Sequence, residues 1–467
     1  MKKLTNYINI DKNIPTIFLV FAVMVGLTFL IITPPFKAPD ESAHFYRAYS
    51  VATFNITSQK QGEEYGTNIP KSIQQMTKDL ESSENPQSNM SQYKHSIKYW
   101  GTRPLNDTVG SFKVFNNSSI YSPVPYIPQA IGINIGRLLH LSPLLVFYSG
   151  RLVNLFVWIL LIYFSIKFIP FGKWVIFCIA LIPISIFQVS SMSADAATYG
   201  LIVFFISLFM YLRSNPVRIS QSTKVLFLTL PLLLSLLKFG YFTFAFFLIF
   251  IPDRYFESKR DKWIKVCLIT VISTVLTLIW YFVVKDINIL YSSPAQDLLV
   301  DPVRQRGYIF TYPLQFVKTI LFTLFIHPVS NNILTSSIGE LGWLNIKIPL
   351  FLIVGNFVTI FLSLISIKPL KSFKLSKPLV LYTAGLIVFL ILFLCIALYI
   401  TYSPVGSVDI AGIQGRYFIP IFALFIILFS YKRTKFSLQA VVPSSIYPAF
   451  YIFSLSIAIY FTFTFYY

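Results

Sequence analysis

Long apolar runs recur along the chain and alternate with short polar segments. About 20 apolar residues in a helix span the hydrocarbon core of a membrane. The pattern predicts eleven transmembrane helices, at residues 14–33, 143–166, 174–190, 197–212, 225–237, 241–252, 263–284, 348–367, 378–400, 417–430 and 445–463. We therefore expect an all-α polytopic membrane protein in which residues 1–467 form a single integral membrane domain.

Three apolar segments do not fit a simple crossing. The runs 225–237 and 241–252 hold only 13 and 12 residues, too few to span about 30 Å at 1.5 Å per residue. They either extend beyond these limits or form a broken pair that meets at Lys238-Phe239-Gly240. If the run 314–327 crossed the membrane, all later loops would change sides. It must therefore return to its starting side, so we interpret it as a re-entrant or interfacial helix.

The segment 35–142 is the one long polar connection, and it follows the first apolar run. Its stretch 55–120 is rich in Ser, Asn, Gln and Lys with little periodicity, which predicts a small, partly irregular cap. Residues 121–143 combine proline breaks with an apolar run, which suggests a helix lying at the membrane interface. With the N-terminus in the cytoplasm, this first loop is predicted to be extracytoplasmic.

Composition supports the membrane assignment. Hydrophobic residues make up 55% of the chain and charged residues 12%, and the mean hydropathy is +0.68, whereas soluble domains carry roughly 25% charged residues. The three cysteines all lie inside apolar runs, so we expect neither a disulfide framework nor a thiolate metal site. Lys2 and Lys3 precede the first run as in a signal peptide, but the run is too long and lacks a small-residue cleavage site, which favours a retained helix.

The formal charge of +20 follows the predicted topology. With the N-terminus inside, the short cytoplasmic loops collect 20 Lys and Arg residues but only four acidic residues, as the positive-inside rule requires. Of the 18 remaining cations, ten lie in the loop 35–142, where that rule hardly applies. The basic balance therefore indicates orientation in a cell membrane and not a nucleic-acid partner.

The strongest chemical signal is the string PPFKAPDESAHFYRAYS at residues 34–50, directly after the first apolar run. If the prolines start a helix near Pro39, Asp40, His44 and Arg47 share one face, because residues three and four apart are neighbours. Glu41 lies beside them in the first turn. The plainer interpretation is an N-capping turn with a satisfied interfacial histidine.

Further ionisable residues lie at the predicted external ends of other helices. They are Arg151, Asp195, Lys238, Arg304, Arg306, Glu340 and Arg416. Each has an ordinary alternative, such as a snorkelling cation, a carboxylate near a helix N-terminus or a contact with lipid head groups. Together with Asp40 and its neighbours, they predict an external pocket for a negatively charged, lipid-linked substrate.

A metal is a further alternative, because Asp40, Glu41, His44 and Asp195 are hard or borderline ligands. Their spacing matches no recognised metal motif, so we expect no cofactor and leave a divalent cation open.

Several strings together resemble the membrane-protein family called domain of unknown function 2142. They are PPFKAPDESAHFYRAY, YSPVPYIPQAIG, YSGRL, SMSAD, LLKFGY, LGW and GIQGRYFIP, in order from about residue 34 to 420. That family is similar to the GT-C glycosyltransferases, polytopic enzymes with an acidic residue in the first external loop and polyprenyl-phosphate sugars as donors. The resemblance implies a GT-C-like helix bundle.

The resemblance also implies roles. Asp40 would be the base that deprotonates the acceptor hydroxyl, with Glu41 as a second carboxylate that positions the acceptor or holds a cation, and His44 would orient Asp40. Arg416, Lys238 and Arg151 would stabilise the departing phosphate. The remaining candidate substrate-binding residues are Arg47, Asp195, Arg304, Arg306 and Glu340. A single displacement would invert the anomeric centre.

The predicted function is thus a membrane glycosyltransferase that modifies an envelope glycan or glycolipid of a bacterium on the external face. Two alternatives stay open, a flippase or transporter of lipid-linked oligosaccharides and a polysaccharide polymerase. A transporter usually shows internal repeats or paired broken helices. We find one broken pair and no repeat, which favours the enzyme over a transporter. The clustered charges make a purely structural membrane scaffold the least favoured interpretation.

Overall fold

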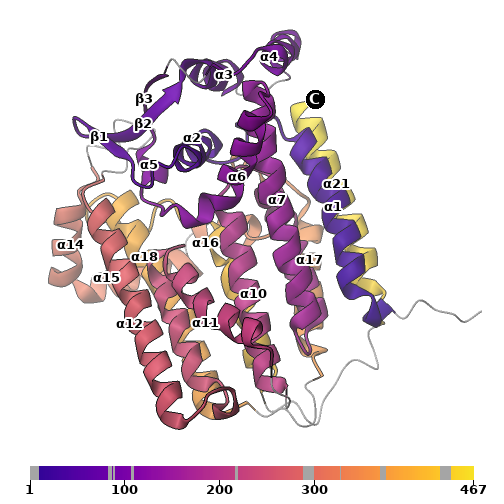
Figure 1. Cartoon of the computed structure of the whole chain (residues 1–467), viewed down its shortest axis with the longest axis vertical. Helices are drawn as coiled ribbons and strands as arrows, with labels where there is room; N and C mark the ends of the chain where they lie inside the picture. The colour runs from indigo at the N-terminus through magenta and orange to yellow at the C-terminus, as the bar shows by residue number, and fades with distance from the viewer. Residues whose placement is uncertain are drawn as a thin grey trace, which may run out of the picture.

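The computed structural model describes residues 10–81, 87, 90–106, 110–215, 219–287, 299–326, 328–368, 375–431 and 443–467. Figure 1 shows a bundle of long, roughly aligned helices with a cap of short helices and strands at one end. The cap is formed by residues 33–142, between the first two long helices. We call this end of the bundle the cap side.

Within the described residues, six helices are long and apolar enough to cross a membrane. They are α1 (Ile14–Ile32), α7 (Pro143–Phe168), α10 (Asp195–Ser214), α12 (Lys259–Val284), α18 (Lys377–Tyr402) and α21 (Ile446–Tyr466). Each coincides with one of the predicted runs. The chain is therefore a multi-pass membrane protein, as its composition indicates.

The other five predicted spans form shorter or interrupted helices, so a count of eleven is not reached. The run 174–190 divides into α8 (Lys173–Ala180) and α9 (Pro183–Val189), and 417–430 into η6 (Gly415–Phe418), α19 (Ile419–Phe422) and α20 (Phe425–Phe429). Proline at the start of α9 and within the first turn of α19 explains these breaks, because it lacks the N–H that would continue the preceding helix. The remaining three are α11 (Gln221–Ser235), the 3-10 helix η4 (Phe239–Phe250) and α17 (Leu350–Ile365).

The predicted break at Lys238 and the predicted re-entrant segment both correspond to bends in the chain. Lys238 is extended and separates α11 from η4. Two helices, α14 (Pro302–Thr311) and α15 (Pro313–Phe325), meet at 106°, a geometry typical of a broken span or a re-entrant loop. Counting this pair as one span raises the number of candidate crossings in the described chain to seven.

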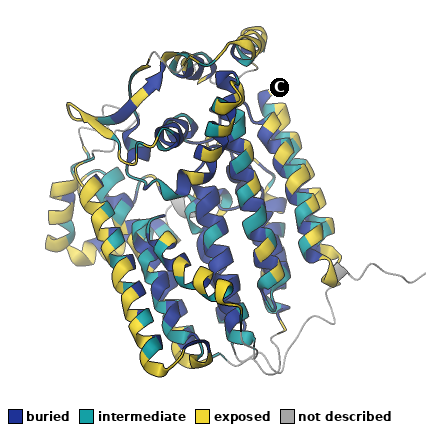
Figure 2. Ribbon diagram, in the orientation of Figure 1, coloured by how far each residue is buried: buried dark blue, intermediate teal, exposed yellow. Residues whose placement is uncertain are grey.

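Burial distinguishes the centre of the bundle from its rim. In α10, 89% of the most apolar window is buried, whereas in α12 the value is 17%. Figure 2 shows the same contrast, with exposed residues along the outer face of α12 and buried residues throughout α10. Because exposed apolar side chains of a membrane protein can face lipid, α10 is the packing core and α12 is peripheral.

The cap combines helices with a small sheet that the sequence did not predict. Strands β1 (Gln59–Gln61), β2 (Glu64–Pro70) and β3 (Gly110–Val114) pair antiparallel in the order β1-β2-β3, with Thr67 opposite Lys113. Around it lie α2 (Glu41–Ala52), α3 (Lys71–Glu81), α4 (Met90–Thr102), α5 (Asn116–Ser119), η3 (Val124–Tyr126) and α6 (Ile127–Leu138). The strands are short and polar, so they carry no alternating apolar pattern.

A few short elements complete the described chain. They are η1 (Ile10–Lys12), η5 (Asp253–Tyr255), α16 (Pro328–Ser336) and the two-stranded pair β4 (Glu340–Leu341) and β5 (Ile346–Lys347). The segment from α16 to β5 matters for the site, because Ile338 accepts a backbone hydrogen bond from Ile184 of α9, and Ser336 Oγ accepts one from Gly415.

Helix α6 has the character of the interfacial helix that the sequence predicts. Its residues Ile127, Ile131, Ile135 and Leu138 are all at least 45% exposed and lie on one face at helical spacing. Its opposite face packs against α7 through Gly132, where an added Cβ would lie 2.3 Å from the Ser149 carbonyl oxygen. Small residues at such a contact let two helix backbones approach closely.

This contact predicts that Gly132→Ala lowers the thermal midpoint of the purified protein, by an overpacking cost of about 1–3 kcal/mol. The matched control is Gly385→Ala in α18, where an added Cβ meets no atom within 4 Å and alanine is the better helix former. We expect the control to unfold at the wild-type temperature or above. Equal midpoints for the two variants would contradict the close approach of α6 and α7.

Candidate functional site

The turn between α1 and α2 is short and conformationally unusual. Pro34 and Pro35 follow the end of α1, and α2 begins at Glu41. Within the turn, Phe36 and Asp40 have φ values of 65° and 57°, the left-handed region that side chains other than glycine rarely adopt. Strained residues of this kind persist only where their surroundings hold them. The carboxylate of Glu41 provides that constraint.

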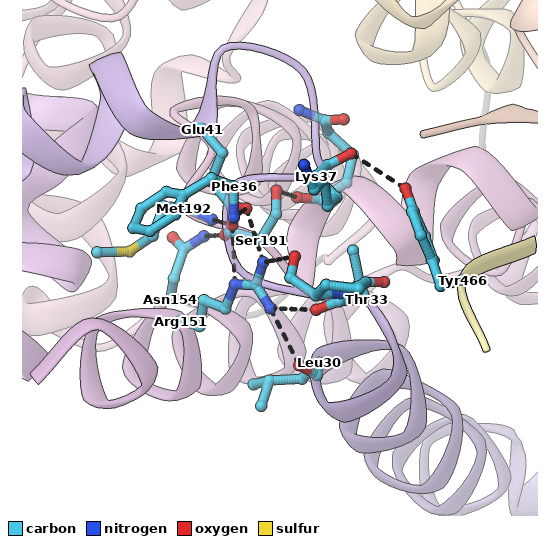
Figure 3. A network of polar contacts seen from close by, with 12 residues as sticks. Leu30, Thr33, Phe36, Lys37, Glu41, Arg151, Asn154, Ser191, Met192 and Tyr466 are labelled. Atoms are coloured by element: carbon cyan, nitrogen blue, oxygen red, sulfur yellow. Dashed lines mark hydrogen bonds and ion pairs between the residues drawn. The ribbon is translucent and has the colours of Figure 1, made fainter. Parts of the chain in front are cut away.

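Glu41 joins three separate parts of the chain. Its Oε2 accepts a hydrogen bond of 2.9 Å from the backbone N–H of Phe36, and its Oε1 accepts one of 2.9 Å from Met192. Both oxygens also bind Arg151 of α7, with Nε–Oε1 at 2.8 Å and Nη2–Oε2 at 2.6 Å. Both side chains are 0% exposed. Figure 3 shows this pair at the centre of its network.

The guanidinium of Arg151 is fully occupied. Beyond Glu41, it donates to the carbonyl oxygens of Leu30, Thr33 and Pro34. These contacts use all five of its N–H groups, and its Cζ atom also lies 4.6 Å from the ring centroid of Phe147. The sequence placed Glu41 and Arg151 among the substrate-facing residues. Their geometry makes them a buried pair that holds the α1–α2 turn against α7.

The loop between α9 and α10 is buried, and amide side chains satisfy its backbone. Asn154 donates to the Ser191 carbonyl oxygen at 2.9 Å, and Gln129 donates to that of Ser193 at 2.9 Å. Because unpaired buried carbonyls are costly, these contacts fix the loop. The loop ends at Asp195, the first residue of α10. Glu41 therefore anchors both the turn before α2, through Phe36, and the loop that precedes Asp195, through Met192.

Four charged side chains come together where these elements meet on the cap side. Asp40 Oδ2 lies 3.7 Å from Arg416 Nη2, and Asp195 Oδ1 lies 3.2 Å from Lys238 Nζ. Asp195 also interacts electrostatically with Arg416. We call Asp40, Asp195, Lys238 and Arg416 the charged cluster. The sequence predicted this juxtaposition from four distant segments.

Exposure differs sharply within the charged cluster. The side chain of Asp40 is 41% exposed, whereas that of Arg416 is 7% exposed. Although Asp40 occupies the N-cap position of α2, its side chain makes no capping hydrogen bond. The alternative of a simple capping carboxylate therefore does not describe it. Asp40 is the carboxylate of this cluster that a polar molecule can reach.

Tyrosines surround the charged cluster, and the sequence analysis did not assign them a role. Tyr417 places its ring 5.6 Å from Lys238 Nζ and 5.4 Å from the Arg416 guanidinium carbon. Tyr199 donates from its hydroxyl to the Arg416 carbonyl oxygen at 3.0 Å. Tyr121 and Tyr126 approach from the cap. A usable signal was present, because three of the four lie within the strings YSPVPYIPQAIG and GIQGRYFIP.

His44 lies on the cap wall of the same site. Its Nδ1 lies 2.7 Å from the hydroxyl of Tyr126. Burial lowers the pKa of His44 below its ordinary value, and the nearby carboxylates of Asp40 and Asp195 only partly oppose that effect. His44 is therefore neutral at neutral pH, and its hydrogen-bond partner is Tyr126.

An apolar groove opens beside the charged cluster. It has a volume of about 190 Å³ and is lined by side chains of α11, η4, α12 and α18, including Trp280, Leu390 and Phe393. Lys238 and Tyr417 line the same groove. Charge and apolar surface therefore meet at Lys238. This shape suits a ligand with an anionic head and a hydrocarbon chain.

The remaining candidates lie elsewhere. Arg47 is buried and donates to the carbonyl oxygens of Asn55, Ile56 and Tyr121, so it holds the cap together. Arg304 and Arg306 are exposed on α14, where Arg304 pairs with Asp301. Glu340 is buried and accepts a hydrogen bond from Thr335. Within the described residues, no hydrogen bond or ion pair joins these four to the charged cluster. The described part of the chain also contains no group of three or more His, Cys, Asp or Glu side chains arranged to hold a metal.

The chain is a multi-pass membrane protein, because its long apolar helices can cross a bilayer. Its candidate binding site is the charged cluster, which lies where these helices meet the polar cap. A family described as "Predicted membrane protein (DUF2142)" matches residues 23–425, so the chain belongs to this family. No curated protein and no solved structure matches the chain.

The buried pair predicts that Glu41→Gln and Arg151→Met each destabilise the protein strongly. Removing one partner of a buried ion pair leaves an uncompensated charge, at a cost of about 3–5 kcal/mol. The control is Asp253→Asn. It breaks an ion pair in which the Asp253 carboxylate is 50% exposed, and solvent-exposed pairs contribute little to stability. Thermal unfolding in detergent measures all three. We expect the double variant Glu41→Leu/Arg151→Met to be less destabilised than either single variant. Wild-type stability of both single variants would contradict the structural role.

The lowered pKa of His44 predicts an acid-sensitive fold. Between that pKa and the unfolded value of about 6.5, the unfolded state binds more protons, so stability falls as the pH falls through this range. The thermal midpoint of wild type should therefore drop between pH 7.5 and pH 5.5. His44→Gln should reduce that drop, whereas His95→Gln on the exposed face of α4 should retain it. Identical pH profiles for all three proteins would contradict this account of His44.

Proposed function

We propose that the protein is a membrane glycosyltransferase that transfers a sugar from a polyprenyl-phosphate donor to an envelope glycan or glycolipid. The reaction takes place on the cap side, which the distribution of Lys and Arg predicts to be the extracytoplasmic face of a bacterial cell membrane. The proposal follows the resemblance to GT-C enzymes, in which an acidic residue of the first external loop is catalytic. Asp40 occupies that position in this chain.

The observation that carries the proposal is the junction of the apolar groove with the charged cluster at Lys238. A polyprenyl-phosphate sugar has a long hydrocarbon chain, a phosphate and a polar sugar in that order. The groove takes the start of the chain, Lys238 and Arg416 face the phosphate, and the sugar points toward Asp40. The three parts of the donor thus follow the same order as the apolar groove, the two cations and the exposed carboxylate of Asp40.

The proposed reaction is a single displacement. Asp40 takes the proton of the acceptor hydroxyl, and the freed oxygen attacks C1 of the donor sugar while the bond from C1 to the phosphate oxygen breaks. Polyprenyl phosphate leaves with the electron pair, and Arg416 and Lys238 stabilise the charge on its oxygen. Attack opposite the leaving group inverts the anomeric centre.

In this scheme Asp195 is a counter-ion. Before the donor binds, it balances Lys238 at 3.2 Å, which avoids an unpaired cation near the membrane interior. The donor phosphate then competes with Asp195 for Lys238. Arg151, a phosphate ligand in the sequence-based hypothesis, has no part in this step because Glu41 and three carbonyls occupy it.

The flippase and polymerase alternatives share the groove and the cations. The partly exposed Asp40 opposite Arg416 favours transfer, because moving a lipid-linked sugar across a membrane needs no base for an acceptor hydroxyl. A polymerase would use the same donor class and the same base, and differs only in taking a growing glycan as its acceptor.

Asp40→Asn should reduce sugar transfer by about 10²- to 10⁴-fold, the usual contribution of a general base, while the purified protein keeps its thermal midpoint. Radiolabelled polyprenyl-phosphate sugar and membranes that contain the endogenous acceptor provide the assay. The control is Glu63→Gln, a cap carboxylate whose side chain is 85% exposed, which should leave transfer unchanged. Full activity of Asp40→Asn would exclude the proposed base, and vesicles that move the donor without any acceptor modification would favour the flippase.

A further inference from the structure

The cap contains a second cavity, separate from the charged cluster. It is a polar hollow of about 460 Å³ between α3 and strand β3, with Tyr46 of α2 among its lining residues. Figure 1 shows α3, β2 and β3 at the end of the molecule farthest from the helix bundle. A ligand of this hollow therefore comes from the aqueous phase and not from the lipid phase.

The charge of the cap hollow is predominantly positive. Lys71 and Lys78 extend from α3 and are exposed, and Lys113 comes from β3. Lys113 Nζ lies 5.5 Å from the centroid of the Tyr46 ring, and because Tyr46 is only 3% exposed, its buried ring supports the lysine from inside the cap. Glu81 also lines the hollow, and its Oε1 accepts a hydrogen bond of 2.9 Å from Ser42 Oγ. Three lysines thus outnumber one carboxylate among the lining residues.

Hydrogen bonds between α3 and the strands hold the wall of the cap hollow in place. Gln74 Nε2 donates to the carbonyl oxygens of Ile69 and Ser111 and to Ser111 Oγ, at 2.8 to 2.9 Å. These bonds tie α3 to the ends of β2 and β3, which pair over five residues. The lysines therefore extend from a framework of fixed spacing. Such a framework suits a ligand with regularly spaced anionic groups.

Helix α2 connects the cap hollow to the charged cluster. Ser42 and Tyr46 are four residues apart on the face toward α3, and Asp40 stands at the start of the same helix. Asp40 and Tyr46 are six positions apart, about 9 Å along a helix. A chain-like ligand held at Lys113, beside Tyr46, is thus close enough to extend past Ser42 to Asp40.

We propose that the cap hollow binds an acidic glycan, through the carboxylates or phosphodiesters that its sugar units carry. Lysine ammonium groups pair with those anions, and the exposed side chain of Gln75 contacts the sugar units. The binding is a property of the cap alone. Its role in catalysis rests on the proposed function, because it would then present a hydroxyl of the acceptor to Asp40.

Binding to the full-length protein in nanodiscs tests the proposal. The probes are an oligogalacturonate, an oligomer of glycerol phosphate and, as the neutral comparison, a galactose oligosaccharide of the same length. We expect one or both anionic probes to bind more tightly than the neutral probe, and more weakly at higher salt. Comparing the two anionic probes shows whether the hollow prefers carboxylates or phosphodiesters. Equal affinity for charged and neutral probes, or no binding of either anionic probe, would overturn the proposal.

A triple variant, Lys71→Gln/Lys78→Gln/Lys113→Gln, should weaken binding of the anionic probe about tenfold, since each exposed ion pair contributes modestly. The matched control is Lys94→Gln/Lys98→Gln/Arg103→Gln, which removes three cations from the α4 region of the same cap outside the hollow. We expect that control to bind as wild type does. An equal loss in both variants would overturn the proposal, because it would mean general attraction to a basic cap.

Asp40→Asn separates this proposal from the proposed function. If the cap hollow binds acidic glycans, that variant keeps wild-type affinity for the probe even when it loses transfer. Intact binding with no transferase activity in wild type would support the hollow and reject the enzyme. Active transfer without a preference for anionic probes would support the enzyme and reject the binding of acidic glycans in the cap hollow.

Discussion

The buried ion pair between Glu41 and Arg151 is the interaction on which the site depends. One carboxylate binds the turn before α2, the loop before α10 and the guanidinium of α7, and the same guanidinium binds the end of α1. Asp40 directly precedes Glu41, and Asp195 follows Met192 by three residues. Fixing Glu41 therefore fixes both carboxylates of the charged cluster. The strained φ of Asp40 is tolerated because this network holds it.

The protein has two cavities of opposite character, and only one of them is lined by a residue of the charged cluster. The apolar groove reaches Lys238 from among the membrane helices, and the polar cap hollow lies beside α2 on the aqueous side. Asp40 stands at the start of α2, the helix whose Tyr46 lines the cap hollow, and it pairs with Arg416 of the charged cluster. Under the proposed function, the apolar groove would take a lipid-borne donor and the cap hollow a water-borne acceptor.

Sequence patterns predict the membrane class, six of the long helices and the meeting of Asp40, Asp195, Lys238 and Arg416. Apolar runs and charges at the ends of membrane helices are local in the sequence, so they can be recognised without knowing the fold. The sequence patterns fail where contacts between segments distant in sequence determine the structure. Proline-interrupted runs look like spans, and the short polar strands of the cap have no period. Arg151 and Arg47 look like free cations until partners distant in sequence, such as Glu41 and the Tyr121 carbonyl, are placed beside them.

The most direct test of the whole account is an experimental structure of the protein in nanodiscs with a bound polyprenyl phosphate. We predict the phosphate within hydrogen-bonding distance of Arg416 and Lys238, with the first isoprene units along Trp280, Leu390 and Phe393. Asp40 should face the open side of that phosphate. A lipid phosphate bound elsewhere, with Asp40 and Arg416 sealed off from the groove by packed side chains, would contradict the proposed reaction centre.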